Sequence, residues 1–95
     1  MSASGEIPVL VTTEFRGVFF GWLPADADKS QRTITLSRCR NVIYWAGSRG
    51  FLGMAASGPD AGSKLGSAAP SVLLHSVTSV SVCTEQAARA MESWQ

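Results

Sequence analysis

Short runs of β-branched and aromatic residues, separated by breaks rich in glycine, proline or charge, recur along this chain and limit its fold most narrowly. The runs have the length and composition of strands, and they lack the helix-sized spacing of a parallel sheet. They cover residues 9–13, 18–23, 32–37, 42–45, 51–56, 71–76 and 77–83. The pattern predicts a mainly β protein, a small antiparallel barrel or rolled sheet of about five to seven strands.

The middle of the chain predicts a strand, a connector and a hairpin. Residues 32–37 alternate between polar and apolar side chains, as a half-buried strand does. Arg38–Asn41 is expected to be a polar connector that leads to the apolar run Val42–Trp45. The glycines of residues 46–50 supply a turn, after which Phe51–Ala56 is expected to return as the second strand of a hairpin.

The C-terminal segment predicts a helix over residues 84–94. Thr84 is a good N-cap, Glu85 suits the positive end of the helix, and the segment is rich in alanine. Four apolar side chains share one helical face: Ala87, Ala90, Met91 and Trp94. This stripe is expected to cover either the open end of the chain's own sheet or a partner subunit.

Length and charge narrow the class of protein. A chain of 95 residues fits a single domain, residues 1–95, with residues 1–6 expected to be frayed. The net charge of +1 gives no general attraction for nucleic acid or anionic lipid, so neither is an expected partner. The N-terminus lacks the pattern of a signal peptide, and no apolar run is long enough to span a membrane. A cytoplasmic protein is therefore expected.

The reactive side chains are few and do not form a known catalytic or metal-binding pattern. Cys39 and Cys83 match no metal-ligand spacing, and we expect two reduced, partly buried thiols. His75 is the lone histidine, sits in an apolar run and is expected to be structural. We therefore predict a protein that is not an enzyme, with no catalytic residues, no metal and no cofactor.

A set of basic and aromatic side chains forms the strongest candidate binding site. Guanidinium groups pair with phosphate oxygens and stack on planar rings, so the combination suits a nucleotide or an anionic peptide. The candidate residues are Arg38, Arg40, Tyr44, Trp45, Arg49 and Lys64. The alternative is that the arginines lie at strand ends, with the two rings in the core or in an oligomer contact.

The glycine-rich segment Gly58–Ser67 contains Lys64. Backbone N–H groups of such a loop can hold a phosphate, to which a lysine adds charge. The segment does not have the Walker spacing, and the alternative is a mobile surface loop.

The aromatic content predicts self-association. A barrel of this length has a small interior, so some of the eight rings are expected to face outwards and to form a homo-oligomer contact.

Three blocks of the sequence resemble a family of small uncharacterised proteins encoded by tailed phages and prophages. They are Val9–Gly21 (VLVTTEFRGVFFG), Arg40–Pro59, which contains RNVIYW and GFLGMAASGP, and VTSV at Val77–Val80 with the helix that follows. The resemblance carries no established activity.

The resemblance implies an accessory factor that acts in the cytoplasm of an infected bacterium. One expected function is a homo-oligomeric sponge that sequesters a nucleotide-derived immune signal, with arginine and lysine on phosphates, rings on bases and the glycine-rich loop as a lid. The alternative is a protein–protein interaction module that uses the Tyr44 and Trp45 face to inhibit a host enzyme, or that serves as a minor virion component.

Overall fold

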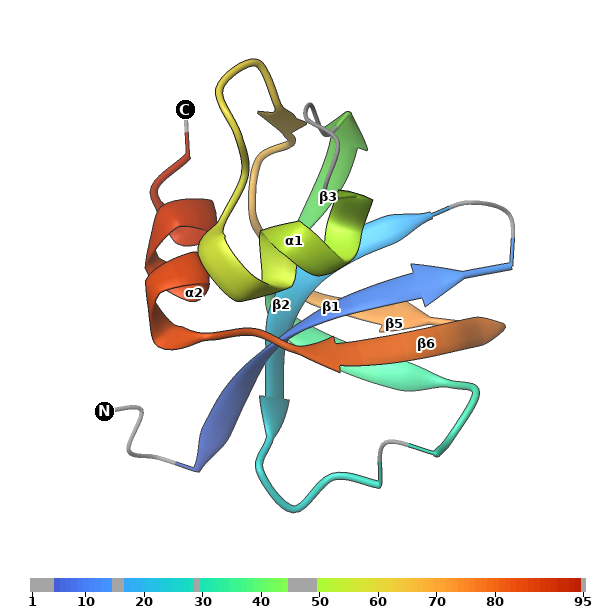
Figure 1. The fold of residues 1–95 in the computed structure, drawn as a ribbon. Helices are drawn as coiled ribbons and strands as arrows, with labels where there is room; N and C mark the ends of the chain where they lie inside the picture. The colour runs from blue at the N-terminus through green and yellow to red at the C-terminus, as the bar shows by residue number, and fades with distance from the viewer. Residues whose placement is uncertain (1–4, 15–16, 29, 45–49, 95) are drawn as a thin grey trace.

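The computed structural model describes residues 5–14, 17–28, 30–44 and 50–94. In this part of the chain it forms six strands and two helices (Figure 1). They are β1 (Glu6–Thr13), β2 (Val18–Pro24), β3 (Ile34–Tyr44), α1 (Gly50–Ser57), β4 (Lys64–Leu65), β5 (Ala69–Leu74), β6 (Val77–Val82) and α2 (Glu85–Glu92). The prediction of a mainly β protein with a C-terminal helix is confirmed.

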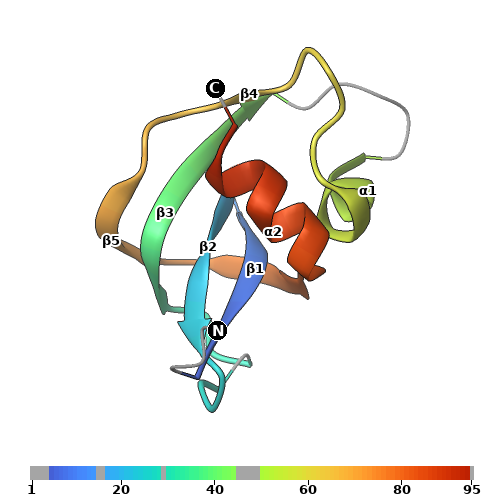
Figure 2. The same ribbon diagram turned by 90° about the vertical axis from the view of Figure 1, so that its left-hand side faces the viewer.

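The strands form one antiparallel sheet in the order β4-β3-β2-β1-β6, with β5 also paired to β3. The chain passes from β5, on one side of the sheet, to β6, on the other, through the corner His75–Ser76. The Val77 N–H donates to the Arg32 carbonyl (2.9 Å), and the Glu14 N–H donates to the Ser76 carbonyl (3.0 Å). These bonds join the corner to Arg32, which precedes β3, and to Glu14, which follows β1. The sheet is therefore rolled, as Figure 2 shows.

Both faces of the sheet carry a core, and β1 contributes to each. Val9, Leu10 and Val11 are completely buried. Leu10 faces the helix-side core, which includes Phe20 from β2, Met54 from α1, and Ala87 and Met91 from α2. The neighbours of Leu10 face the roll core, together with Leu23, Leu36, Cys39 and others. A strand that is buried on both faces explains the unbroken apolar run at its centre.

The helix α2 covers the chain's own sheet. The Thr84 hydroxyl accepts a hydrogen bond from the Ala87 N–H (3.1 Å), which caps the helix, and donates one to the Ala56 carbonyl (2.8 Å), which ties α2 to α1. Ala87 and Met91 are fully buried in the helix-side core, and Trp94 packs against it. The predicted cap and C-terminal helix are confirmed. Of the predicted stripe, Ala87 and Met91 are buried, Ala90 and Trp94 are partly buried, and Ala88, which was not predicted, is buried as well.

The prediction of a connector at Arg38–Asn41 was wrong, because β3 runs through it without a break. Trp22 lies opposite Ser37 and Phe20 opposite Arg40, so β3 carries one extra residue, a β-bulge, between these pairs. Arg38 lies within this bulge and has a φ of 49°. The polar sequence therefore marks an irregularity inside a strand and not its end.

The prediction of a strand at Phe51–Ala56 was also wrong, since this segment lies in α1. Leucine, methionine and alanine are good helix formers, and a short apolar run has no period that distinguishes a helix from a strand. The helix ends at Ser57 and is followed by Gly58, whose φ is 92° and whose N–H donates to the Met54 carbonyl (2.8 Å). Glycine adopts this conformation without the steric penalty of a Cβ.

We expect Gly58→Ala to destabilise the protein more than Gly5→Ala. Both glycines have positive φ, so each substitution costs about 1 kcal/mol from the backbone. A Cβ on Gly58 would also lie 2.9 Å from the Cβ of Ala90, whereas nothing lies within 4 Å of one on Gly5. The added clash is expected to cost about 1–2 kcal/mol more. Urea unfolding measures both, and equal losses would contradict the close approach of α1 to α2.

Candidate functional site

Arg40 is buried and bonds to backbone carbonyls. Its side chain donates to the carbonyls of Gly66 (2.7 Å), Leu65 (3.3 Å) and Met91 (2.7 Å), with a longer bond to that of Glu92 (3.4 Å). Only 8% of the residue is exposed. These bonds join β3 to β4 and to the C-terminal end of α2, where a positive charge also suits the helix dipole. The guanidinium is therefore not free to bind phosphate.

Arg38 contacts the same end of α2 through the Glu92 side chain. Its guanidinium lies 3.2 Å from a Glu6 carboxylate oxygen and 3.5 Å from one of Glu92. It also lies over the Trp22 ring, 4.9 Å from the ring centre. The structure thus brings Arg38 and Arg40 together around Glu92, the first on its carboxylate and the second on its carbonyl.

Tyr44 and Lys64 form a separate pair at the end of β3. They lie opposite each other in the β3–β4 register, and Lys64 is exposed. Tyr44 is 56% exposed, and the preceding Ile43 is 62% exposed. We call Ile43, Tyr44 and Lys64 the β3–β4 tip, which projects at the top of Figures 1 and 2. Trp45 and Arg49, the remaining predicted site residues, lie outside the described residues.

The glycine-rich loop is held against α2. The Trp94 indole N–H donates to the Ser63 carbonyl (2.9 Å), and Ser63 and Leu65 are buried. The bonds from Arg40 to Leu65 and Gly66 hold the next part of the loop. This loop also contains β4, which the sequence did not predict.

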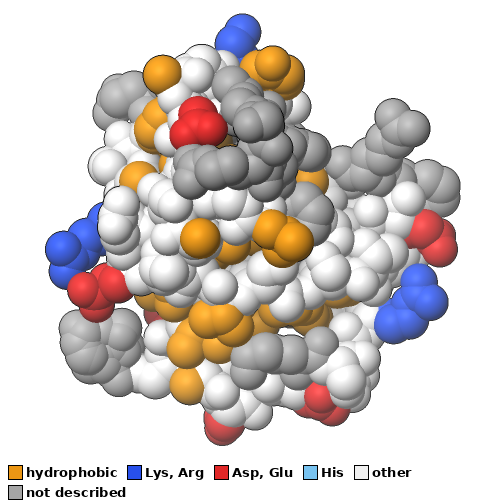
Figure 3. All heavy atoms as spheres, viewed as in Figure 1, with side chains coloured by type: hydrophobic (Ala, Val, Ile, Leu, Met, Phe, Trp, Pro, Cys, Tyr) orange, Lys and Arg blue, Asp and Glu red, His pale blue; other side chains and the backbone are white. Residues whose placement is uncertain are grey.

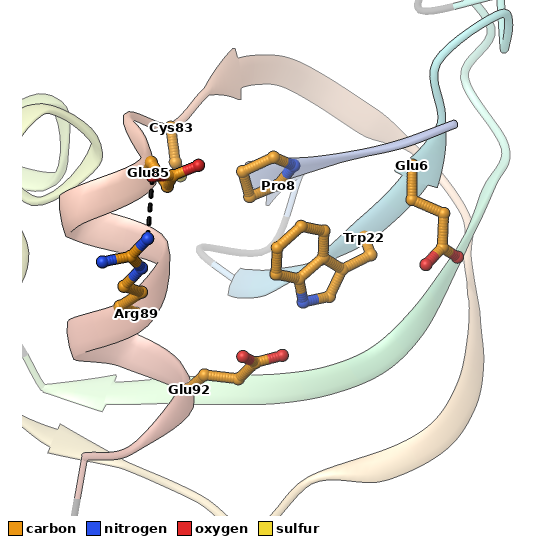
Figure 4. A pocket seen from close by; sticks show the side chains of 7 residues that line it. All are labelled: Glu6, Pro8, Trp22, Cys83, Glu85, Arg89 and Glu92. Carbon is orange, nitrogen blue, oxygen red and sulfur yellow. Dashed lines mark hydrogen bonds and ion pairs between the residues drawn. The ribbon is translucent and has the colours of Figure 1, made fainter. Parts of the chain in front are cut away.

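A cavity of about 360 Å³ lies between β1, β2 and α2 (Figure 4). The strands contribute Glu6, Pro8 and Trp22 to its wall. The connector before α2 contributes Cys83, and α2 itself contributes Glu85, Arg89 and Glu92. We call this cavity the Trp22 pocket. It lies at the edge of the helix-side core, against which Trp22 packs.

Around the Trp22 pocket the glutamates pair with arginines, whereas the Trp22 indole N–H has no partner. Glu85 pairs with Arg89 (2.9 Å) one helical turn away, whereas Glu6 and Glu92 share Arg38. The Trp22 indole nitrogen is buried and has no hydrogen-bond partner. Figure 4 shows this nitrogen on the side of the ring that faces Glu92.

Both thiols are buried, in different cores. Cys39 lies in the roll core, and Cys83 in the helix-side core. Burial raises the pKa of the Cys39 thiol to about 11 and that of Cys83 to about 12. His75 was predicted to lie in an apolar strand, but it lies at the exposed corner between β5 and β6. In the described part of the chain, no three histidine, cysteine or acidic side chains are grouped to hold a metal ion.

A family model described as "Domain of unknown function (DUF6948)" matches residues 6–91. The chain belongs to this family. The match begins at the first residue of β1 and ends within α2, so it includes both cores and the Trp22 pocket apart from Glu92. No curated protein and no solved structure matches the chain.

The Trp22 pocket was not found from the sequence of this DUF6948 domain. Its tryptophan, its flanking glutamates and Arg38 come from four elements that are far apart in the chain. The apolar run of β2 gave Trp22 the pattern of an ordinary strand residue. Only the pairing of β1, β2 and β3 shows that these side chains meet.

None of the helices within residues 5–14, 17–28, 30–44 and 50–94 is long and apolar enough to cross a membrane.

We expect Arg40→Met to lower the free energy of unfolding by about 3 kcal/mol or more, because it leaves buried carbonyls of β4 and α2 without their charged donor. Arg89→Met is the matched control, since the Arg89 side chain is 77% exposed and pairs only across the surface of α2. It is expected to cost less than about 1 kcal/mol. Urea denaturation compares the two, and similar losses would show that Arg40 is not a structural link.

We expect alkaline pH to destabilise the protein partly through its thiols. Between pH 9 and 11 an unfolded chain releases the thiol protons, whereas the folded chain keeps them, because burial raises both pKa values. The stabilisation is thus complete below pH 9 and is lost as the pH rises to about 11 and 12. A Cys39→Ala, Cys83→Ala double variant is expected to lose less stability over this range. If the free energy of unfolding, measured by urea denaturation, falls equally with pH in both proteins, the burial of the two thiols is contradicted.

Proposed function

We propose that this protein is a non-enzymatic binding protein that contacts a partner protein through the β3–β4 tip. The observation that carries the proposal is the exposure of Ile43 and Tyr44 at consecutive positions. The β3–β4 register shifts between Val42 and Tyr44, so Ile43 is an extra residue that regular alternation does not turn towards the core. The end of the strand therefore presents two large apolar side chains in succession. Such side chains, and tyrosine in particular, are frequent at the centres of protein interfaces.

The state of the thiols supports a function without covalent chemistry. A thiol acts as a nucleophile when it is ionised and accessible. Cys39 and Cys83 are buried with raised pKa values, while His75 is exposed. The phage resemblance suggests a partner in the cytoplasm of an infected bacterium, either a host enzyme or a virion protein.

A second candidate function, sequestration of a nucleotide by a homo-oligomer, is favoured by the pairing of Tyr44 with Lys64. An exposed ring can stack on a base, and an ammonium group beside it can pair with a phosphate. Arg38 and Arg40 do not support this function, because both are engaged around Glu92. Among the described residues, any nucleotide site at the tip therefore depends on Lys64 for its positive charge.

Another exposed apolar side chain provides a control surface. Val82 of β6 is 57% exposed. Figure 3 shows hydrophobic side chains grouped across the lower middle of the face that β6 crosses in Figure 1. Val82→Ser therefore removes a comparable apolar side chain from a different element.

Affinity capture from lysate of the host bacterium, followed by direct binding to the captured protein once purified, tests the tip. Tyr44→Ser and Ile43→Ser are expected to weaken binding about tenfold or more, whereas Val82→Ser leaves it unchanged. Loss of binding with Val82→Ser alone would place the surface on β6 and overturn the proposal. Calorimetry with cyclic and linear nucleotides tests the second function, and binding that is lost in Lys64→Met would support it. Binding of neither class would contradict both functions.

A further inference from the structure

Beyond a partner surface at the β3–β4 tip, we propose that the Trp22 pocket binds a monovalent organic cation, an ammonium or guanidinium group. The ligand competes with Arg38 for the carboxylates of Glu6 and Glu92 and for the Trp22 ring. The ligand is a free amine or guanidine, or the same group on a lysine or arginine side chain. The proposal rests on the charge around the pocket, the tryptophan wall and the exposure of the ion pairs.

The residues that line the Trp22 pocket carry more negative than positive charge. They include three glutamates, Glu6, Glu85 and Glu92, and one arginine, Arg89. Glu85 pairs with Arg89, whereas Glu6 and Glu92 pair with Arg38, which lies beside the pocket. The buried Arg40 contacts the carbonyl of Glu92 and not its carboxylate. A cation that enters the pocket is attracted by this negative lining, and an anion is not.

The wall of the pocket suits an alkyl cation. Trp22 already holds a guanidinium over its ring at 4.9 Å, which shows that the ring accepts a cation in this structure. Pro8 lies opposite Trp22 in the β1–β2 register and adds an apolar surface. A cavity of about 360 Å³ is large enough for a side chain of the size of lysine.

The indole N–H of Trp22 indicates that the pocket is incomplete. Among the described residues, it is the buried side-chain polar atom that lacks a hydrogen-bond partner. Buried donors are normally paired, and an unpaired one marks a strained or ligand-dependent position. Because the nitrogen has almost no exposed surface, a carbonyl oxygen on the ligand would pair with this donor only after the Trp22 ring turns towards the pocket. The lysine of a peptide carries both the cation and such an acceptor.

The ion pairs of Arg38 are exchangeable. The Arg38 side chain is 50% exposed, and that of Glu92 is 46% exposed. Solvent therefore screens these contacts, and an entering cation competes with Arg38 for the same carboxylates and the same ring. Removal of a positive residue should then strengthen the binding of a positive ligand, which a merely structural arginine would not do.

The test follows the indole N–H signal of Trp22 by NMR, identified by its absence in Trp22→Phe. The probes are butylammonium, Nα-acetyl-lysine N-methylamide, butanol and butyrate. We expect saturable shifts with the two cations and none with butanol or butyrate. Tighter binding of the lysine derivative would show that its carbonyls are recognised, as a peptide source requires. Equal binding of the two cations would favour a free amine. Equal effects of cations and butanol would overturn the proposal.

Charge variants complete the test. Arg38→Met is expected to tighten cation binding about fivefold, and Glu6→Gln to weaken it about fivefold. The controls Arg32→Met and Glu14→Gln remove the members of another exposed ion pair (3.6 Å) and are expected to change nothing. Unchanged or weaker cation binding in Arg38→Met would show that Arg38 does not compete with the ligand. If that variant does not fold, the comparison of Glu6→Gln with Glu14→Gln still decides whether the pocket binds cations.

Discussion

The buried guanidinium of Arg40 is the interaction on which the arrangement of this domain depends. A charge in the interior is tolerated only when its donors are satisfied, and here carbonyls from β4, the following loop and the end of α2 satisfy them. The same bonds fix where α2 ends and where β4 lies. Because α2 covers the outer face of β1 and β2, the position of Arg40 also sets the depth of the helix-side core.

The Trp22 pocket follows from this arrangement. With the end of α2 held by Arg40, the Glu92 side chain projects towards β2, and the bulge in β3 places Arg38 between Glu92 and Glu6. A regular strand would lack the extra residue of this bulge. With it, Arg38 pairs with carboxylates and Arg40 bonds to buried carbonyls. A positive φ at a non-glycine residue is costly, and such residues are frequent at functional sites.

The sequence was informative where structure is set by local patterns. The runs that form β1, β2 and β6 and the capped helix α2 were all predicted, because alternation, β-branched residues and an N-cap act over a few residues. The continuity of β3 was missed, since the burial of Arg40 depends on carbonyls from distant segments. The helix α1 was missed because its short apolar run has no diagnostic period. The candidate site was only partly predictable: Arg38 was predicted to be a binding residue, but its partners Glu6, Trp22 and Glu92 meet only in three dimensions.

The corner between β5 and β6 has a consequence for how the molecule is made. The first three strands are successive neighbours, so they can pair soon after synthesis. Closure of the roll joins Thr13 to Val77, which are distant in sequence, and α2 follows later still. On a ribosome, the inner face of the early meander therefore stays uncovered until the last quarter of the chain has emerged, and chaperones have access to it during that interval.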